Sequence, residues 1–189
     1  MAKAYRYWYY LDMSYYDEIY EIAVDQHYLI TTCEARDAEI PPVELRKLAH
    51  RGKLDHLGYG LYRLSRYVPS DVDPYAVAVA LAGPGARLHG ESVIAMLGLA
   101  PTNPAFIYVE SPRRVRRKLE DGVVLKKANA DEPITTYMGV PSQTVKHAIL
   151  SARKTMMDDR LREAASAARD EGYLTHCELA DLSKEMSWT

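Results

Sequence analysis

The stretch that decides the fold is residues 29–64, LITTCEARDAEIPPVELRKLAHRGKLDHLGYGLYRL. Within it Thr31 is followed three residues later by Glu34, which is the pattern of a capping box and predicts the start of a short helix. The Pro-Pro pair at 41–42 suits the first turn of a further helix, and Gly52 closes that helix. The stretch therefore predicts two short helices joined by a tight turn.

Two short apolar runs follow, at residues 54–57 and 61–64, and both are strand candidates. They flank Gly58-Tyr59-Gly60, a glycine-bracketed connection that is typical of a β-hairpin. Upstream, a Ser-x-x-Asp pattern begins a helix expected over residues 14–26. Three helices with a tight middle turn, followed by a basic hairpin, are the layout of a winged helix-turn-helix, whose third helix enters a major groove of DNA.

The third helix and the hairpin are basic. Residues 42–67 hold six Lys and Arg against two acidic residues, a local balance of plus four. Cations beside phosphates supply affinity for DNA, and Arg or Lys near base edges supplies specificity. We expect Arg46 and Lys47 to read base edges and Tyr59 to lie along the backbone or the minor groove. The alternative is a solvated helix face. The candidate DNA-binding residues are Arg46, Lys47, His50, Arg51, Lys53, Tyr59 and Arg63.

A polar, proline-bounded segment at residues 69–74 predicts a domain boundary. The sequence thus predicts an α+β protein with two domains. Residues 1–68 form the winged helix-turn-helix domain, and residues 74–189 form a mixed α/β domain with a small antiparallel sheet. Asp73 is expected to cap the first helix of the second domain. Further helices are expected at 91–98, 142–150, 158–169 and 175–185, and strands at 106–110, 123–126 and 134–138.

A second basic cluster lies in the C-terminal part of the chain, and we expect it to contact DNA or the acidic surface of a partner protein. The alternative is an exposed edge whose like charges discourage strand pairing. Its residues are Arg113, Arg114, Arg116, Arg117 and Lys118.

Composition excludes several classes of protein. The 189 residues are 48% hydrophobic and 26% charged, which is ordinary for a globular chain and leaves room for two small domains. No apolar stretch approaches the roughly 20 residues that cross a bilayer, and the aromatic, charge-interrupted start does not resemble a secretory signal. We therefore expect a cytoplasmic protein. Cys33 and Cys177 provide neither a disulfide framework nor a zinc-ligand spacing.

The sequence carries no common enzyme motif, and we expect no catalytic residue, metal or cofactor. Asp71-Val-Asp73 resembles the paired carboxylates of nucleotidyl transfer but lacks the glycine-serine phosphate loop that precedes them. His89, close to Glu91, is interpreted as a local hydrogen-bonding group. The first sixteen residues contain seven aromatic side chains, which either pack on their own domain or form a surface for a partner. These residues are Tyr5, Tyr7, Trp8, Tyr9, Tyr10, Tyr15 and Tyr16.

The order of these motifs resembles the AbiEi family of antitoxins, the regulatory half of type IV toxin–antitoxin pairs. In the first domain the resemblance lies in LITT at 29–32, LRKL at 45–48 and GLYRL at 60–64. In the second domain it lies in ALAGPGA at 80–86 and ESVIAMLGL at 91–99.

This resemblance implies a winged-helix domain that binds inverted repeats in double-stranded promoter DNA of its own operon, and a second domain that counters a nucleotidyltransferase toxin. Neither role is enzymatic. Direct contact with the toxin and indirect antagonism both stay open, as does self-association of two copies on paired half-sites. Two other hypotheses remain: a winged-helix regulator whose second domain binds an effector or a protein, and an enzyme with the winged helix as an interaction module.

Overall fold

The computed structural model describes residues 14–102, 104–116, 119, 121–129 and 132–188. The chain divides into two compact units, Met1–Ser70 and Asp71–Thr189. This division falls inside the proline-bounded segment of residues 69–74. Each unit has a buried hydrophobic cluster of its own.

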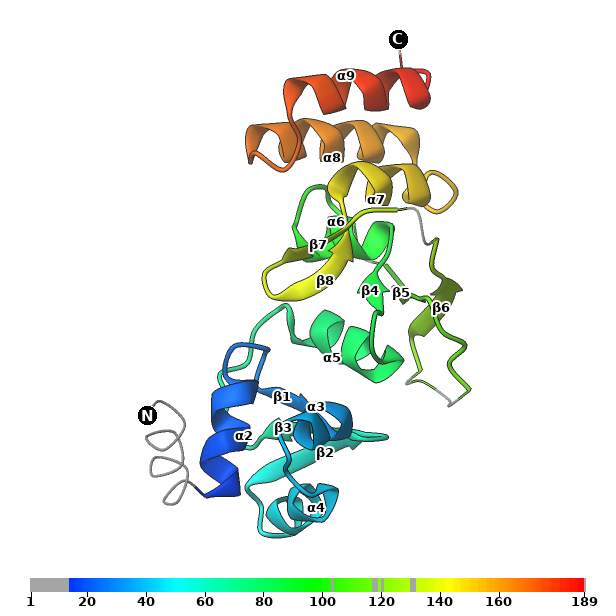
Figure 1. Ribbon diagram of the computed structural model, residues 1–189. Coiled ribbons are helices and arrows are strands. Elements are labelled where there is room, and N and C mark those ends of the chain that lie inside the picture. The colour runs from blue at the N-terminus through cyan, green and yellow to red at the C-terminus, as the bar shows by residue number, and fades with distance from the viewer. Residues whose placement is uncertain (1–13, 103, 117–118, 120, 130–131, 189) are drawn as a thin grey trace, which may run out of the picture. The chain divides into compact units, whose positions relative to one another are not determined.

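The first unit contains helices α2 (Tyr15–Ala23), α3 (Thr32–Asp37) and α4 (Pro42–His50), coloured blue to cyan in Figure 1. The helix starts predicted at Ser14 and Thr31 are confirmed, and the capping box predicted at Thr31 is present. Ser14 forms a capping box as well, because in both cases the side chain accepts from the backbone three residues on and the acidic partner reaches back. These caps satisfy backbone donors that a helix start leaves without partners. Local sequence therefore determines where α2 and α3 begin.

A three-stranded antiparallel sheet completes the first unit. Its strands are β1 (Leu29–Thr31), β2 (Leu54–Gly58) and β3 (Leu61–Leu64), and their order is β1-β3-β2. The predicted hairpin is confirmed. Strand β1 was not predicted, because three residues show too little alternation to reveal a strand and only pairing with β3 defines it.

The core of the first unit is built from one apolar side of each element. Ile19 of α2, Ile30 of β1, Leu45 of α4 and Leu64 of β3 are fully buried. Leu48 and Ala49 pack against this cluster from the inner side of α4. Burial of this stripe leaves the charged side of α4 in solvent.

The second unit is built around a five-stranded sheet of order β6-β5-β4-β8-β7. Its strands are β4 (Arg87–Leu88), β5 (Ile107–Ser111), β6 (Val123–Lys127), β7 (Ile134–Tyr137) and β8 (Val140–Gln143). The expectation of a small antiparallel sheet is wrong, because β5 pairs with β6 and β4 with β8 in parallel. The sheet is larger than expected and mixed. The sequence missed β4, which has two residues, and β8, whose last residues were assigned to the following helix.

Five helices in the described residues of the second unit accompany this sheet: α5 (Asp73–Ala82), α6 (Glu91–Met96), α7 (Val145–Ala152), α8 (Asp158–Asp170) and α9 (His176–Glu185). Two boundaries differ from expectation. The N-cap of α5 is Val72, so Asp73 is the first helical residue and not the cap. Helix α7 begins after its cap Thr144, because the preceding residues pair in β8.

Figure 1 shows α7, α8 and α9 stacked beside one another at the C-terminal end of this unit. Their buried side chains, including Ile149, Leu161, Ala165 and Leu182, form one hydrophobic cluster with Ile94 of α6. No helix in the described part of the chain is long and apolar enough to span a membrane.

Candidate nucleic-acid interface

The outer side of α4 presents four of the predicted DNA-binding residues. Arg46, Lys47 and His50 are exposed, and Arg51, the C-cap residue, is exposed directly after them. Their spacing of one, four and five positions places them on one helical face, opposite the buried Leu45. The structure thus brings these four side chains together as the sequence predicted.

The charge on this face is only partly neutralised. Lys47 Nζ lies 2.8 Å from Glu44 Oε1, and the Lys47 side chain is still 51% exposed. An exposed pair three residues apart contributes little to stability and exchanges readily with water. Lys47 therefore stays available to another anion.

The hairpin of β2 and β3 lies next to α4 in the chain and carries three further candidates. Tyr59 stands in the connection with 79% of its surface exposed. Gly60 follows it with φ +69, a backbone conformation that residues other than glycine rarely adopt. Gly60 O accepts from both Thr32 N (2.8 Å) and Thr32 Oγ1 (3.1 Å). The connection is therefore attached to the start of α3.

Arg63 and Lys53 are less free than the residues of α4. Arg63 lies on the central strand β3 and is half-buried, with its guanidinium 3.8 Å from the centre of the Tyr67 ring. Lys53 is exposed, and its ammonium lies 5.8 Å from the centre of the Tyr16 ring on α2. Both contacts are within cation–π range. The sequence did not predict these contacts of the two cations with tyrosine rings.

The second basic cluster is only partly described. Arg113, Arg114 and Arg116 follow β5 and are exposed, whereas Arg117 and Lys118 lie outside the described residues. Parallel pairing of β5 with β6 adds two lysines to this region. Lys126 stands opposite Glu110 in the strand register, and its Nζ lies 4.9 Å from the centre of the Tyr108 ring. The exposed Lys127 follows it.

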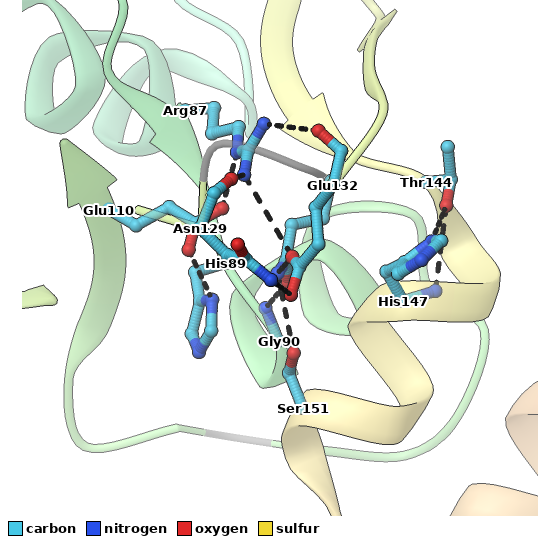
Figure 2. A network of polar contacts seen from close by, with 10 residues as sticks. Arg87, His89, Gly90, Glu110, Asn129, Glu132, Thr144, His147 and Ser151 are labelled. Atoms are coloured by element: carbon cyan, nitrogen blue, oxygen red, sulfur yellow. Dashed lines mark hydrogen bonds and ion pairs between the residues drawn. The ribbon is translucent and has the colours of Figure 1, made fainter. Parts of the chain in front are cut away.

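Sequence reasoning missed a buried polar network in the second unit, shown in Figure 2. Arg87 of β4 and Glu110 of β5 form an ion pair between side chains that are only 3% and 2% exposed. Arg87 Nη1 also donates to Glu132 O (3.0 Å), and Nη2 donates to Asn129 O (2.9 Å). Such a pair needs further hydrogen bonds to offset the cost of burial, and each of the three guanidinium nitrogens of Arg87 makes one.

His89 belongs to the same network. Its Nδ1 lies 3.2 Å from Glu110 Oε2, although the contact is poorly aligned for a hydrogen bond. Burial by itself would raise the pKa of Glu110, but His89 and Arg87 contact the carboxylate and together outweigh it, so this pKa lies below its ordinary value. The interpretation of His89 as a local group is corrected, because its partner is 21 positions along the chain and Glu91 instead accepts from Thr102 Oγ1 (3.0 Å).

Gln143 of β8 closes the network. Its Nε2 donates to Glu132 Oε2 (2.7 Å) and Ser151 Oγ (3.3 Å), and its Oε1 accepts from Gly90 N (2.9 Å). The network thus joins β4, β5, β8 and α7 with the connection that leads into β7 (Figure 2). The side-chain nitrogens of Arg87 and Gln143 donate to protein acceptors, so we interpret the network as a structural element. Among the described residues, no group of three or more His, Cys, Asp or Glu is arranged to hold a metal ion.

Comparison with known families gives a match within the first unit. Residues 17–65 match the model of a family described as transcriptional regulator, AbiEi antitoxin. The match runs from α2 through the hairpin of β2 and β3, so the resemblance inferred from the sequence is confirmed for this unit. It ends before the second unit, where the resemblance stays a prediction. A search of curated proteins found no match.

Proposed function

We propose that the first unit is a winged helix-turn-helix domain that binds double-stranded promoter DNA. The element order α2-β1-α3-α4-β2-β3, with β3 between β1 and β2, supports this proposal. In this arrangement α3 and α4 are the helix pair, α4 is the recognition helix, and the connection at Tyr59 is the wing. The observation that carries the proposal is the exposed cationic side of α4, within a segment that matches a family of transcriptional regulators.

We further propose that the chain is the antitoxin of a type IV pair and represses its own operon. Two copies would occupy the two halves of an inverted repeat, because a two-fold operator presents the same half-site twice. The second unit would counter a nucleotidyltransferase toxin, either by contact or indirectly. This part of the proposal rests on the AbiEi match of the first unit and on the motifs at residues 80–86 and 91–99.

The second basic cluster offers an additional surface for this role. Arg113, Arg114, Arg116 and Lys127 are exposed and could meet either phosphates or an acidic patch on the toxin. Phosphate contact and toxin contact predict different effects of salt and of substitution. We propose that the cluster is an anion-binding surface. The salt dependence of promoter affinity distinguishes phosphate contact from toxin contact.

The test is promoter binding by the full chain. Fluorescence anisotropy with the DNA upstream of its gene, beside a scrambled duplex, measures affinity at two salt concentrations. Replacing Arg46 and Lys47 with Ala should cost about 1–3 kcal/mol per base-reading contact. The matched control replaces Arg160 and Lys184, an exposed Arg and Lys of the second unit, with Ala. Equal affinity of wild type for both duplexes, or an unchanged affinity of the α4 variant, would contradict the proposal.

The antitoxin role has a separate test. The full chain and its α4 variant are each expressed with the toxin encoded by an adjacent reading frame, and growth is measured. Rescue by both proteins would separate neutralisation from DNA binding. Failure of the wild-type chain to restore growth would contradict the antitoxin proposal and leave promoter binding unaffected.

A further inference from the structure

The connection at the tip of the β2–β3 hairpin is attached to the start of α3 through one carbonyl group. Gly60 O receives the backbone N–H of Thr32 at 2.8 Å and the Thr32 hydroxyl at 3.1 Å. Thr32 is the first residue of α3 and is 28 positions from Gly60 in the chain. The attachment is thus a tertiary contact between two elements that the proposed function uses for DNA binding.

This contact completes the N-terminus of α3. The Thr31 hydroxyl caps the helix by accepting from Glu34 N (3.2 Å). The N–H of Thr32 is another of the donors that a helix start leaves unsatisfied, and the hairpin supplies its acceptor. The helix start and the hairpin tip therefore hold each other in place.

The approach of the two groups is too close for a side chain at position 60. A Cβ atom on Gly60 would lie 2.9 Å from Thr32 Oγ1, a distance that real Cβ contacts almost never show. Gly52 has nearly the same backbone conformation, φ +67 against +69, yet a Cβ there would meet nothing within 4 Å. A Cβ at position 60 would therefore displace the Thr32 hydroxyl, in addition to straining the backbone angle.

Tyr59 is the residue that this arrangement keeps exposed. It precedes Gly60 directly and is the most exposed large hydrophobic side chain among the described residues. A side chain at the end of a hairpin makes reproducible contacts only when the backbone beneath it is fixed. The two bonds from Thr32 provide that restraint next to Tyr59.

We propose that Thr32 is a positioning residue for DNA binding, which fixes the connection that carries Tyr59 and so couples the start of α3 to the hairpin tip. This inference rests on the proposed function of the first unit. Thr32 acts through Gly60, and its hydroxyl, unlike its backbone N–H, can be removed by substitution.

The experiment compares Thr32→Val, Thr32→Ser and Tyr59→Ala in the full chain. Valine keeps the shape of threonine and removes the hydroxyl, whereas serine keeps the hydroxyl. We expect Thr32→Val to weaken promoter binding about two- to tenfold, as loss of one hydrogen bond implies, and Thr32→Ser to restore it. The control Thr102→Val, which removes the hydroxyl bonded to Glu91 in the second unit, should leave affinity unchanged.

Combining Thr32→Val with Tyr59→Ala separates positioning from stability. If Thr32 acts through Tyr59, the double variant binds no more weakly than Tyr59→Ala alone. Affinities are measured well below the unfolding temperature of every variant, so a loss of stability alone does not change them. If wild type prefers the operator, unchanged promoter affinity of Thr32→Val would overturn the inference. Additive losses of affinity in the double variant would overturn it as well. Equal binding of wild type to operator and scrambled DNA would instead reject the proposed function itself, and the inference with it.

Discussion

Replacing Glu110 with Gln tests the buried network of the second unit. The substitution removes the charge of one partner in an ion pair whose two side chains are almost completely buried. Removal of one partner of such a pair costs about 3–5 kcal/mol, because the other charge stays buried. The glutamine oxygen can still accept from Arg87 Nε, so we expect the lower end of this range.

Replacing Arg87 with Met should cost more. It leaves the Glu110 carboxylate without its guanidinium and removes the donors to Asn129 O and Glu132 O. Each lost hydrogen bond adds about 0.5–1.5 kcal/mol. The expected order of destabilisation is therefore Arg87→Met above Glu110→Gln. The control Lys184→Met, an exposed cation paired with Asp181, should stay within about 0.5 kcal/mol of wild type.

The assay is urea unfolding of the full chain followed by the fluorescence of Trp188. This residue belongs to the second unit, and its Nε1 donates to Asp158 Oδ1 at 2.7 Å. Trp8 is replaced with Phe in all variants so that Trp188 is the only tryptophan. A loss of unfolding free energy below about 1 kcal/mol for Glu110→Gln would refute the description of the pair as buried. Equal losses for the two variants would refute a contribution of the bonds from Arg87 to the two carbonyl groups.

The same variants have an expected pH dependence. The pKa of Glu110 is lowered in the folded protein, so its contribution to stability is present above the unfolded pKa and is lost as pH falls through the folded pKa. The stability difference between wild type and Glu110→Gln should therefore shrink below the ordinary carboxyl pKa of 4.5. A difference that stays constant through this pH range would contradict the ionised state assigned to Glu110.

Two further predictions concern the first unit and the second basic cluster. Gly60→Ala should destabilise the first unit more than Gly52→Ala. Both substitutions add similar backbone strain of about 1–2 kcal/mol, but only Gly60→Ala displaces the Thr32 side chain. Equal loss of amide-exchange protection in the two variants would contradict this. If the second basic cluster contacts DNA, replacing Arg113 and Arg114 with Ala should lower the salt slope of promoter binding by about 0.9 per phosphate contact. An unchanged slope, together with loss of the ability to restore growth against the toxin, would assign the cluster to toxin contact.

Local patterns in the sequence predicted most elements of both units. The capping boxes at Thr31 and Ser14 were predictable because their partners lie three residues away, within a single turn of helix. The hairpin around Tyr59 was predictable because its glycines mark the turn directly. The exposed residues of α4 followed from the same reasoning, since a helical stripe that buries Leu45 leaves the other side in water.

Other features depend on partners that are distant in the chain. Strand β4 has two residues and is defined by pairing with β5 and β8, so no periodicity could reveal it. The parallel pairs of the second sheet were missed for the same reason. Arg87 and Glu110 lie 23 positions apart, and only the sheet brings them together.

The sequence by itself determined the starts of α2 and α3, the hairpin and the cationic side of α4, because each follows from interactions within a few residues along the chain. The tertiary structure alone decided the mixed sheet, the buried pair of Arg87 and Glu110, and the attachment of Gly60 to Thr32. Hydrogen bonds and ion pairs between distant residues depend on how the chain folds back on itself, and the spacing of residues along the chain does not contain that information.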